Sequence, residues 1–239
     1  MRVGFSAVVL WVWRRPDWRR WTVQRRRAVV AFGVVLAAMN LCFYLAVNRL
    51  PLGTAVAIEF SGPIAVAAFG TRCRRSVGAL VLAALGVGLL ADVQWAASPL
   101  GVALALGAAA LWAGYILLAT TVAGGGQAGL DGLACSMVVG AVFIGPTGVA
   151  AVWTGRPPLV VIAACALVGV LSNVVPYGLD VVVLPRLSAA QFALLLSLLP
   201  ATATVVGVVV LRQIPTVVEL AGVLLVVLAV FVRPRELVA

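Results

Sequence analysis

Long apolar runs recur along the whole chain, and short breaks containing Arg, Gly or Pro separate them. A membrane-spanning helix needs about 20 consecutive apolar residues, because each residue adds about 1.5 Å along the helix axis. The pattern predicts eight spans, near residues 28–47, 51–70, 76–92, 99–122, 131–153, 159–180, 188–211 and 215–232. None of the breaks is long enough for a soluble domain. We therefore expect one all-α integral membrane bundle.

A shorter apolar segment at residues 3–13 precedes these spans and has about half the length that a span needs. It does not have the pattern of a secretory signal, because Trp13 and Arg14 stand where a cleavage site needs small residues. We interpret it as the second half of a helix. The chain would then have about nine membrane segments, the first of them partial.

The composition agrees with this interpretation. Of the 239 residues, 64% are hydrophobic and 10% are charged, and the mean hydropathy is +1.19, whereas a soluble domain is about one quarter charged. The chain has no histidine, its four cysteines are widely separated, and the glycine-rich stretch at 124–132 lacks the Lys-Ser/Thr of a phosphate-binding loop. The sequence therefore predicts no metal site, no cofactor and no enzymatic activity.

All 17 basic residues are Arg, and the net charge is +10. They lie in the breaks, without the interleaved aromatic residues of a nucleic-acid surface, so no nucleic-acid partner is expected. Alternate breaks place 13 Arg on one side of the membrane and 4 on the other. The positive-inside rule predicts that the Arg-rich side, and the C-terminus with it, is cytoplasmic. The cluster at 14–27 is expected to be a solvated loop that contacts anionic lipid head groups.

The spacing N-x-x-x-Y occurs twice in the chain. It appears at Asn40 and Tyr44 and recurs 133 residues later at Asn173 and Tyr177. The four-residue spacing puts each pair on one helix face, and amide and phenol groups can bind a polar substrate. The alternative role is hydrogen bonding between helices, which is common in membrane bundles.

Pro63 and Pro200 form a second match, at an offset of 137 residues. With five helices in each copy, the second copy would enter the membrane in the opposite sense, as in many secondary transporters. We predict inverted five-helix repeats at residues 1–122 and 123–239, the first of them incomplete at its N-terminus. The substrate site is expected near the midplane, where the two halves meet.

Glu59 lies near the centre of the apolar run 51–70. A carboxylate at that depth is costly, which favours a role in substrate binding or coupling. The alternative is a structural Glu that pairs with an Arg or with a helix-terminal N–H of a neighbouring helix. If transport is coupled to protons, Glu59 is the expected carrier.

Gly62 and Pro63 follow Glu59 in the same span. A proline inside a helix removes one backbone donor and frees a carbonyl one turn earlier, so we expect a kink or a local opening of this helix. Pro200 is expected to act in the same way in the second copy. Gly62, Pro63 and Pro200 are therefore the predicted hinge residues, and a kink that serves packing alone is the alternative.

Two further acidic residues have simpler explanations. Asp180 is expected near the end of its helix, where it can pair with Arg186. Glu219 is expected near the start of the last helix, where an acidic side chain complements the helix dipole. Neither is predicted to contact substrate.

Three stretches, at residues 39–67, 106–118 and 172–201, resemble the EamA-domain family of the drug/metabolite transporter superfamily, in particular its threonine/homoserine exporter-like branch. The resemblance implies ten helices in two inverted repeats, and export of small amino acids or related metabolites across the bacterial cytoplasmic (inner) membrane. It aligns residues 1–11 with the middle of the family's second helix, so the family's first helix is expected to be missing.

The sequence departs from the resembled branch at two places that concern substrate. Leu199 stands before Pro200 where similar exporters tend to carry Glu, and residues 211–213 replace an LGE-like ending. The leading hypothesis is a secondary transporter that exports small polar metabolites, such as the neutral amino acids threonine and homoserine, by alternating access. The alternatives are efflux of lipophilic cations or drugs, with Glu59 as counter-ion, and a truncated membrane protein that does not transport.

Overall fold

The computed structural model describes most of the chain. The described residues are 2–18, 21–70, 74–95, 97–123, 126–155, 158–175, 199–200 and 202–232. All the regular elements among them are helices, and no strand occurs in these ranges. The predicted all-α membrane bundle is confirmed.

The chain divides into two compact units. Unit 1 contains Met1–Ala37 and Leu117–Arg186, and unit 2 contains Ala38–Ile116 and Leu187–Ala239. The chain passes between the units inside two long helices, α2 (Val23–Val47) and α6 (Pro99–Ala123). Each unit therefore combines segments from both of the predicted repeats. The repeats at 1–122 and 123–239 remain a prediction.

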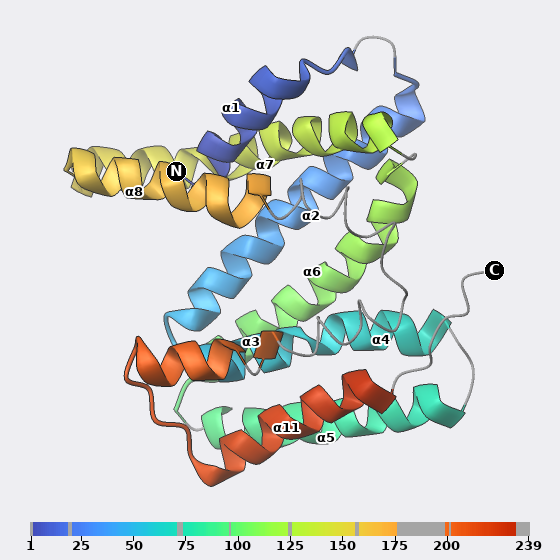
Figure 1. Cartoon of the computed structure of the whole chain (residues 1–239), viewed down its shortest axis with the longest axis vertical. Helices are drawn as coiled ribbons and strands as arrows, with labels where there is room; N and C mark the ends of the chain where they lie inside the picture. The colour runs from blue at the N-terminus through green and yellow to red at the C-terminus, as the bar shows by residue number, and fades with distance from the viewer. Residues whose placement is uncertain are drawn as a thin grey trace. The chain divides into compact units, whose positions relative to one another are not determined.

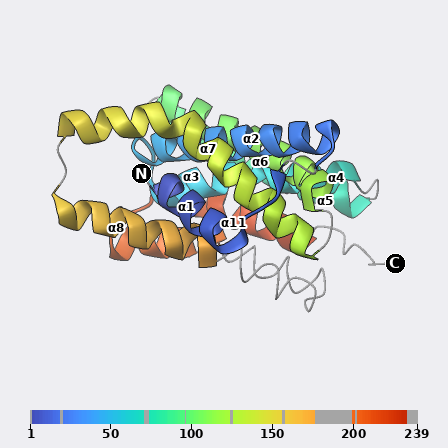
Figure 2. The same cartoon turned by 90° about the horizontal axis from the view of Figure 1, so that it is seen from above.

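Unit 1 is built around α1 (Arg2–Arg14), which packs against α7 (Gly126–Gly155) and α8 (Leu159–Gly169). Figure 2 shows α1 alongside both helices. α8 continues into a π-helical turn, η2 (Val170–Val174). The hydroxyl of Ser6, which is fully buried, donates a hydrogen bond of 2.9 Å to the carbonyl of Gly169. This bond satisfies a polar side chain that would otherwise be costly to bury.

Unit 2 contains two short helices in sequence, α3 (Leu52–Glu59) and α4 (Ser61–Gly70), followed by α5 (Arg74–Trp95). The last helix, α11 (Val217–Val232), lies along α5 and also contacts α3 (Figure 1). Residues 202–209 form a further helical stretch. The core of this unit is made of buried apolar side chains that include Ile58, Phe60, Ile64, Leu90 and Val226.

The predicted spans correspond largely to helices where the structure describes them; half of the span at 188–211 and the end of the span at 159–180 lie outside the described residues. Three helical segments of the described part are long and apolar enough to cross a membrane, namely Val23–Val47, Pro99–Leu118 and Gly129–Pro146. Many large apolar side chains are exposed, with Ile214 at 88% and Leu159 at 79%. So much exposed apolar surface is typical of a protein that faces lipid.

Two glycines allow α5 and α11 to approach closely. A Cβ atom on Gly86 would lie 2.7 Å from the carbonyl oxygen of Gly222. A Cβ atom on Gly222 would lie 2.7 Å from Cγ of Leu90. Small residues at such crossings let helix backbones pack together in membranes, where no hydrophobic force drives helices together.

We predict that Gly86→Leu destabilises unit 2, because the new side chain has no space against α11. Overpacking of this kind costs about 1–3 kcal/mol. The expected result is a lower melting temperature of the purified protein in detergent. Gly88→Leu in the same helix is the matched control, because a Cβ atom there meets nothing within 4 Å. Equal melting temperatures of the two variants would contradict the close packing of α5 and α11.

Candidate functional site

The helix that carries Glu59 is interrupted directly after that residue. α3 ends at Glu59, Phe60 forms a turn, and α4 starts at Ser61. Pro63 is the third residue of α4 and has no N–H, so the carbonyl of Glu59 lacks the donor that normally lies four residues ahead. The neighbouring bond from Phe60 N to Val56 O, at 3.0 Å, is intact. Glu59 therefore carries two acceptor groups: a backbone carbonyl that lacks its usual helical donor, and the side-chain carboxylate.

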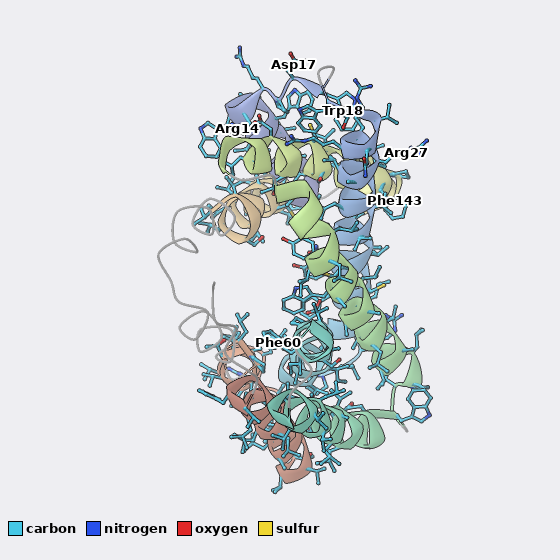
Figure 3. All side chains as sticks on the ribbon, turned by 90° about the vertical axis from the view of Figure 1, so that its right-hand side faces the viewer. Arg14, Asp17, Trp18, Arg27, Phe60 and Phe143 are labelled. Atoms are coloured by element: carbon cyan, nitrogen blue, oxygen red, sulfur yellow. The ribbon has the colours of Figure 1, made fainter. Side chains whose placement is uncertain are left out.

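Glu59 is buried in the core of unit 2. Only 8% of it is exposed, and the adjacent Ile58 and Phe60 are 0% and 1% exposed. The ring of Phe60, labelled in Figure 3, packs edge-on against Trp112 with the ring centroids 5.1 Å apart. Among the described residues, the Glu59 carboxylate has no hydrogen-bond or ion-pair partner. One form of the structural alternative requires an Arg that pairs with Glu59. The described part of the chain contains no Arg in that position.

Gly62 holds the interrupted helix against α6. It is buried, and a Cβ atom at this position would collide with the carbonyl group of Ala109. The backbones of α4 and α6 therefore touch here without an intervening side chain. Because Trp112 follows Ala109 by less than one helical turn, the same part of α6 also supports Phe60.

Asn40 and Tyr44 both lie on α2. Asn40 is half-buried, whereas Tyr44 is 45% exposed and its ring packs edge-on against Phe43, with the centroids 5.7 Å apart. Both residues make further interactions. Tyr44 is therefore much more exposed than Glu59.

The second-half counterparts are only partly described. Asn173 lies in the π-helical turn η2, and Tyr177 falls outside the described residues. π-Helical turns are rare and occur often at functional sites. Pro200 is buried, and its carbonyl accepts a hydrogen bond of 2.9 Å from Oγ1 of Thr204. The roles predicted for these residues, and for Glu59, Asn40 and Tyr44, remain predictions. The suggested pair Asp180–Arg186 also lies outside the described residues.

Sequence reasoning missed the full role of Glu219, which is only 3% exposed. Its Oε2 accepts hydrogen bonds from N and Oγ1 of Thr216, at 2.7 and 3.0 Å. In return, the N–H of Glu219 donates to Oγ1 of Thr216 at 3.3 Å. This is a capping box at the start of α11, and the T-x-x-E spacing in the sequence was the signal that could have revealed it.

The other carboxylate oxygen of Glu219 ties α11 to two more helices. Oε1 accepts a 2.6 Å hydrogen bond from Nε2 of Gln94, at the end of α5, and a 3.4 Å bond from Oγ1 of Thr54 in α3. Close by, Oε1 of Gln213 accepts a 2.9 Å bond from the N–H of Leu52. We call Thr54, Gln94, Gln213, Thr216 and Glu219 the Glu219 cluster.

The Glu219 cluster adjoins a cavity of about 10 Å³, which is the size of roughly one water molecule. Arg212 precedes the cluster with a φ of 56°, a left-handed conformation in which the chain turns after the helical stretch 202–209. This turn delivers Gln213 to the start of α3, whose N-cap residue Pro51 makes no side-chain capping bond. The cluster therefore satisfies helix ends that would otherwise lack partners.

We predict that Glu219→Ala destabilises the protein, because the Gln94 amide and the N–H of Thr216 lose their acceptor. These donors are at most part-buried, so we expect a cost of about 0.5–2 kcal/mol, comparable to the loss of a helix cap. Glu219→Gln keeps one acceptor oxygen and should cost less. Thermal unfolding in detergent measures both effects.

Threonine substitutions provide the matched control for this prediction. Thr216→Val removes the capping hydroxyl and should lower the melting temperature, whereas Thr202→Val removes a hydroxyl whose hydrogen bond among the described residues goes to the carbonyl of Leu199, three residues earlier. Equal effects of the two Thr variants, or an unchanged melting temperature of Glu219→Ala, would contradict a stabilising role of the cluster.

Comparison with known proteins identifies clear relatives. The profile of the EamA-like transporter family matches residues 99–233. The threonine/homoserine exporter RhtA of Escherichia coli (strain K12) is 35% identical over 224 residues, which cover 92% of this chain and 75% of that protein. The protein of the same name from Salmonella typhimurium (strain LT2) is 34% identical over the same shares. No solved structure matches the chain.

Proposed function

Because the chain belongs to the EamA-like transporter family, we propose that this multi-pass membrane exporter of small metabolites carries neutral amino acids such as threonine and homoserine. The substrate class is supported by the similarity to the threonine/homoserine exporters, which extends over 92% of this chain. At Leu199 and residues 211–213 the sequence departs from the pattern of similar exporters. We propose that they adjust the choice of substrate.

Glu59 is the residue that we propose to bind the substrate. The observation that carries this proposal is its burial, without a described partner, at the interruption between α3 and α4. An amino acid carries an ammonium group, which donates hydrogen bonds. The buried carboxylate of Glu59 and its backbone carbonyl, which lacks its usual helical donor, can both accept them. A carboxylate that also takes up a proton would exchange that proton for the substrate, which couples export to a gradient.

The working cycle that we propose is alternating access between two membrane sides. Asn40, Tyr44, Asn173 and Tyr177 contribute amide and phenol groups to the substrate path, and Gly62, Pro63 and Pro200 act as hinges. In the inverted-repeat transporters, interrupted helices of this kind form the binding site and move during transport. The α3–α4 interruption supports the same role here.

We propose that the Arg-rich side of the protein, with the C-terminus, faces the cytoplasm. The breaks at residues 48–50, 93–98 and 212–214, which adjoin Pro51 and contain Gln94 and Gln213, are then on the opposite side. In this orientation the Glu219 cluster closes the outer end of unit 2, while Glu59 lies deeper along the same helical path from Leu52. Substrate would leave the cell past the cluster.

We predict that Glu59→Gln abolishes export while the protein still folds, because the amide keeps the shape of the side chain but loses its charge. Efflux of radiolabelled threonine from preloaded cells should fall to the level of cells without the protein. Glu219→Gln is the matched control, since it alters the other buried glutamate of unit 2 and should retain export. Unchanged efflux by Glu59→Gln would make Glu59 a structural residue.

The substrate class is tested by growth of a sensitive bacterial host. Expression of this chain should allow growth at higher concentrations of threonine or homoserine, because an exporter lowers their level inside the cell. Expression should give no protection from the lipophilic cation tetraphenylphosphonium. Protection from that cation alone, abolished by Glu59→Gln, would establish the alternative in which Glu59 is the counter-ion of a drug-efflux protein.

A further inference from the structure

α6 presents one face to the interrupted helix pair of unit 2. The residues of this face recur at spacings of three, four and three, which puts them on one side of the helix, and they are Val102, Ala105, Ala109 and Trp112. The first three are at most 4% exposed, and Trp112 packs against the same apolar core. α6 crosses the line of α3 and α4 (Figure 1) and is itself one uninterrupted helix. It is therefore a firm support beside the interruption.

The backbone alone holds the interruption only weakly. On the α3 side, the N–H of Phe60 bonds to the carbonyl of Val56 at 3.0 Å. On the α4 side, the carbonyl of Glu59 would need a donor from residue 63, and Pro63 has none. The next bond, from the N–H of Ile64 to the carbonyl of Phe60, is 3.3 Å long, whereas such bonds are usually about 2.7–3.2 Å. Side-chain contacts therefore do much to set the angle between α3 and α4.

Trp112 makes the aromatic contact at the interruption. Phe60 is the residue between the two helices and is 1% exposed. Its ring meets the ring of Trp112 edge-on, with 5.1 Å between the centroids and 88° between the planes. Aromatic pairs prefer this arrangement, which adds stability beyond the burial of the rings. Three residues earlier on α6, Ala109 touches the backbone of Gly62 in the first turn of α4. α6 thus contacts both the interruption and the helix that follows it.

We propose that Trp112 is a positioning residue for transport. By holding the ring of Phe60, it fixes the backbone that carries the adjacent Glu59 and so the direction of the carboxylate. Without this contact the two helices would adopt several angles, of which only some present the carboxylate to the substrate. The apparent affinity then falls in proportion to the fraction of productive molecules. This inference rests on the proposed binding of substrate by Glu59.

The test measures threonine transport by the purified full-length protein in proteoliposomes, over a range of threonine concentrations. Trp112→Leu should raise KM about three- to tenfold, because the loss of one aromatic pair makes unproductive angles accessible. The maximal rate should change much less. A merely structural role would give the opposite result, since a smaller folded fraction lowers the maximal rate and leaves KM unchanged.

Two further variants control for ring chemistry and for core packing. Trp112→Phe keeps an aromatic ring and should recover most of the affinity that Trp112→Leu loses. Leu104→Ala is the matched control, because Leu104 lies on α6 about two turns before Trp112 and packs against the same core. It should leave KM unchanged. An unchanged KM in Trp112→Leu, or an equal rise in Leu104→Ala, would overturn the inference.

Phe60→Leu removes the other ring of the pair and decides the question if Trp112→Leu does not fold. It should raise KM by a similar factor. The double variant should show no further rise, because both substitutions break the same contact. Independent, additive effects of the two substitutions would contradict a role of Trp112 through Phe60.

Glu59→Gln, in the same assay, separates this inference from the proposed function. If Glu59→Gln transports threonine as well as the unaltered protein, the proposed role of Glu59 fails and the inference fails with it. If transport depends on Glu59 while Trp112→Leu and Phe60→Leu leave KM unchanged, the proposed function stands and the inference alone fails.

Discussion

The satisfaction of backbone polar groups in an apolar environment is the constraint on which this structure depends. In hydrocarbon each unpaired N–H or C=O costs several kcal/mol, so a spanning segment is normally an uninterrupted helix. The break between α3 and α4 departs from this rule at one place, where Pro63 provides no donor for the carbonyl of Glu59. Irregular backbone at membrane depth is tolerated where protein surrounds it or where it lines a water-filled path. The burial of Glu59 in unit 2 meets the first of these conditions.

The Glu219 cluster meets the same constraint by pairing polar groups at helix ends. Here three helix ends meet, and Glu219 accepts hydrogen bonds from Thr54, Gln94 and Thr216, while Gln213 accepts one from the N–H of Leu52. The two buried glutamates of unit 2 therefore differ in kind. Glu219 is surrounded by donors and stabilises helix ends, whereas the carboxylate of Glu59 has no such partners among the described residues. This contrast supports the proposal that Glu219 has a structural role and that Glu59 binds the substrate.

Much of the fold could be predicted from the sequence, because the length of apolar runs reports directly on helices that face lipid. The interruption after Glu59 lies next to Gly62 and Pro63. The sequence predicted it there because a proline cannot donate a backbone hydrogen bond inside a helix. The ties of Glu219 to Gln94 and Thr54 could not be predicted, since those partners are 125 and 165 residues away in the sequence. Periodicity identifies which residues share a helix face, but not which helix that face meets.

The contact between Gly62 and Ala109 has a consequence for how this protein can change during evolution. Two main chains touch there without flexible side chains between them. A sideways displacement of α6 is then passed directly to α4, which starts two residues after Glu59, because no side chain lies between the two backbones to absorb it. Substitutions along α6 can thus adjust the position of the carboxylate while its chemical identity stays the same. If Glu59 binds the substrate as proposed, residues of α6 that never touch the transported molecule can change substrate preference by this route.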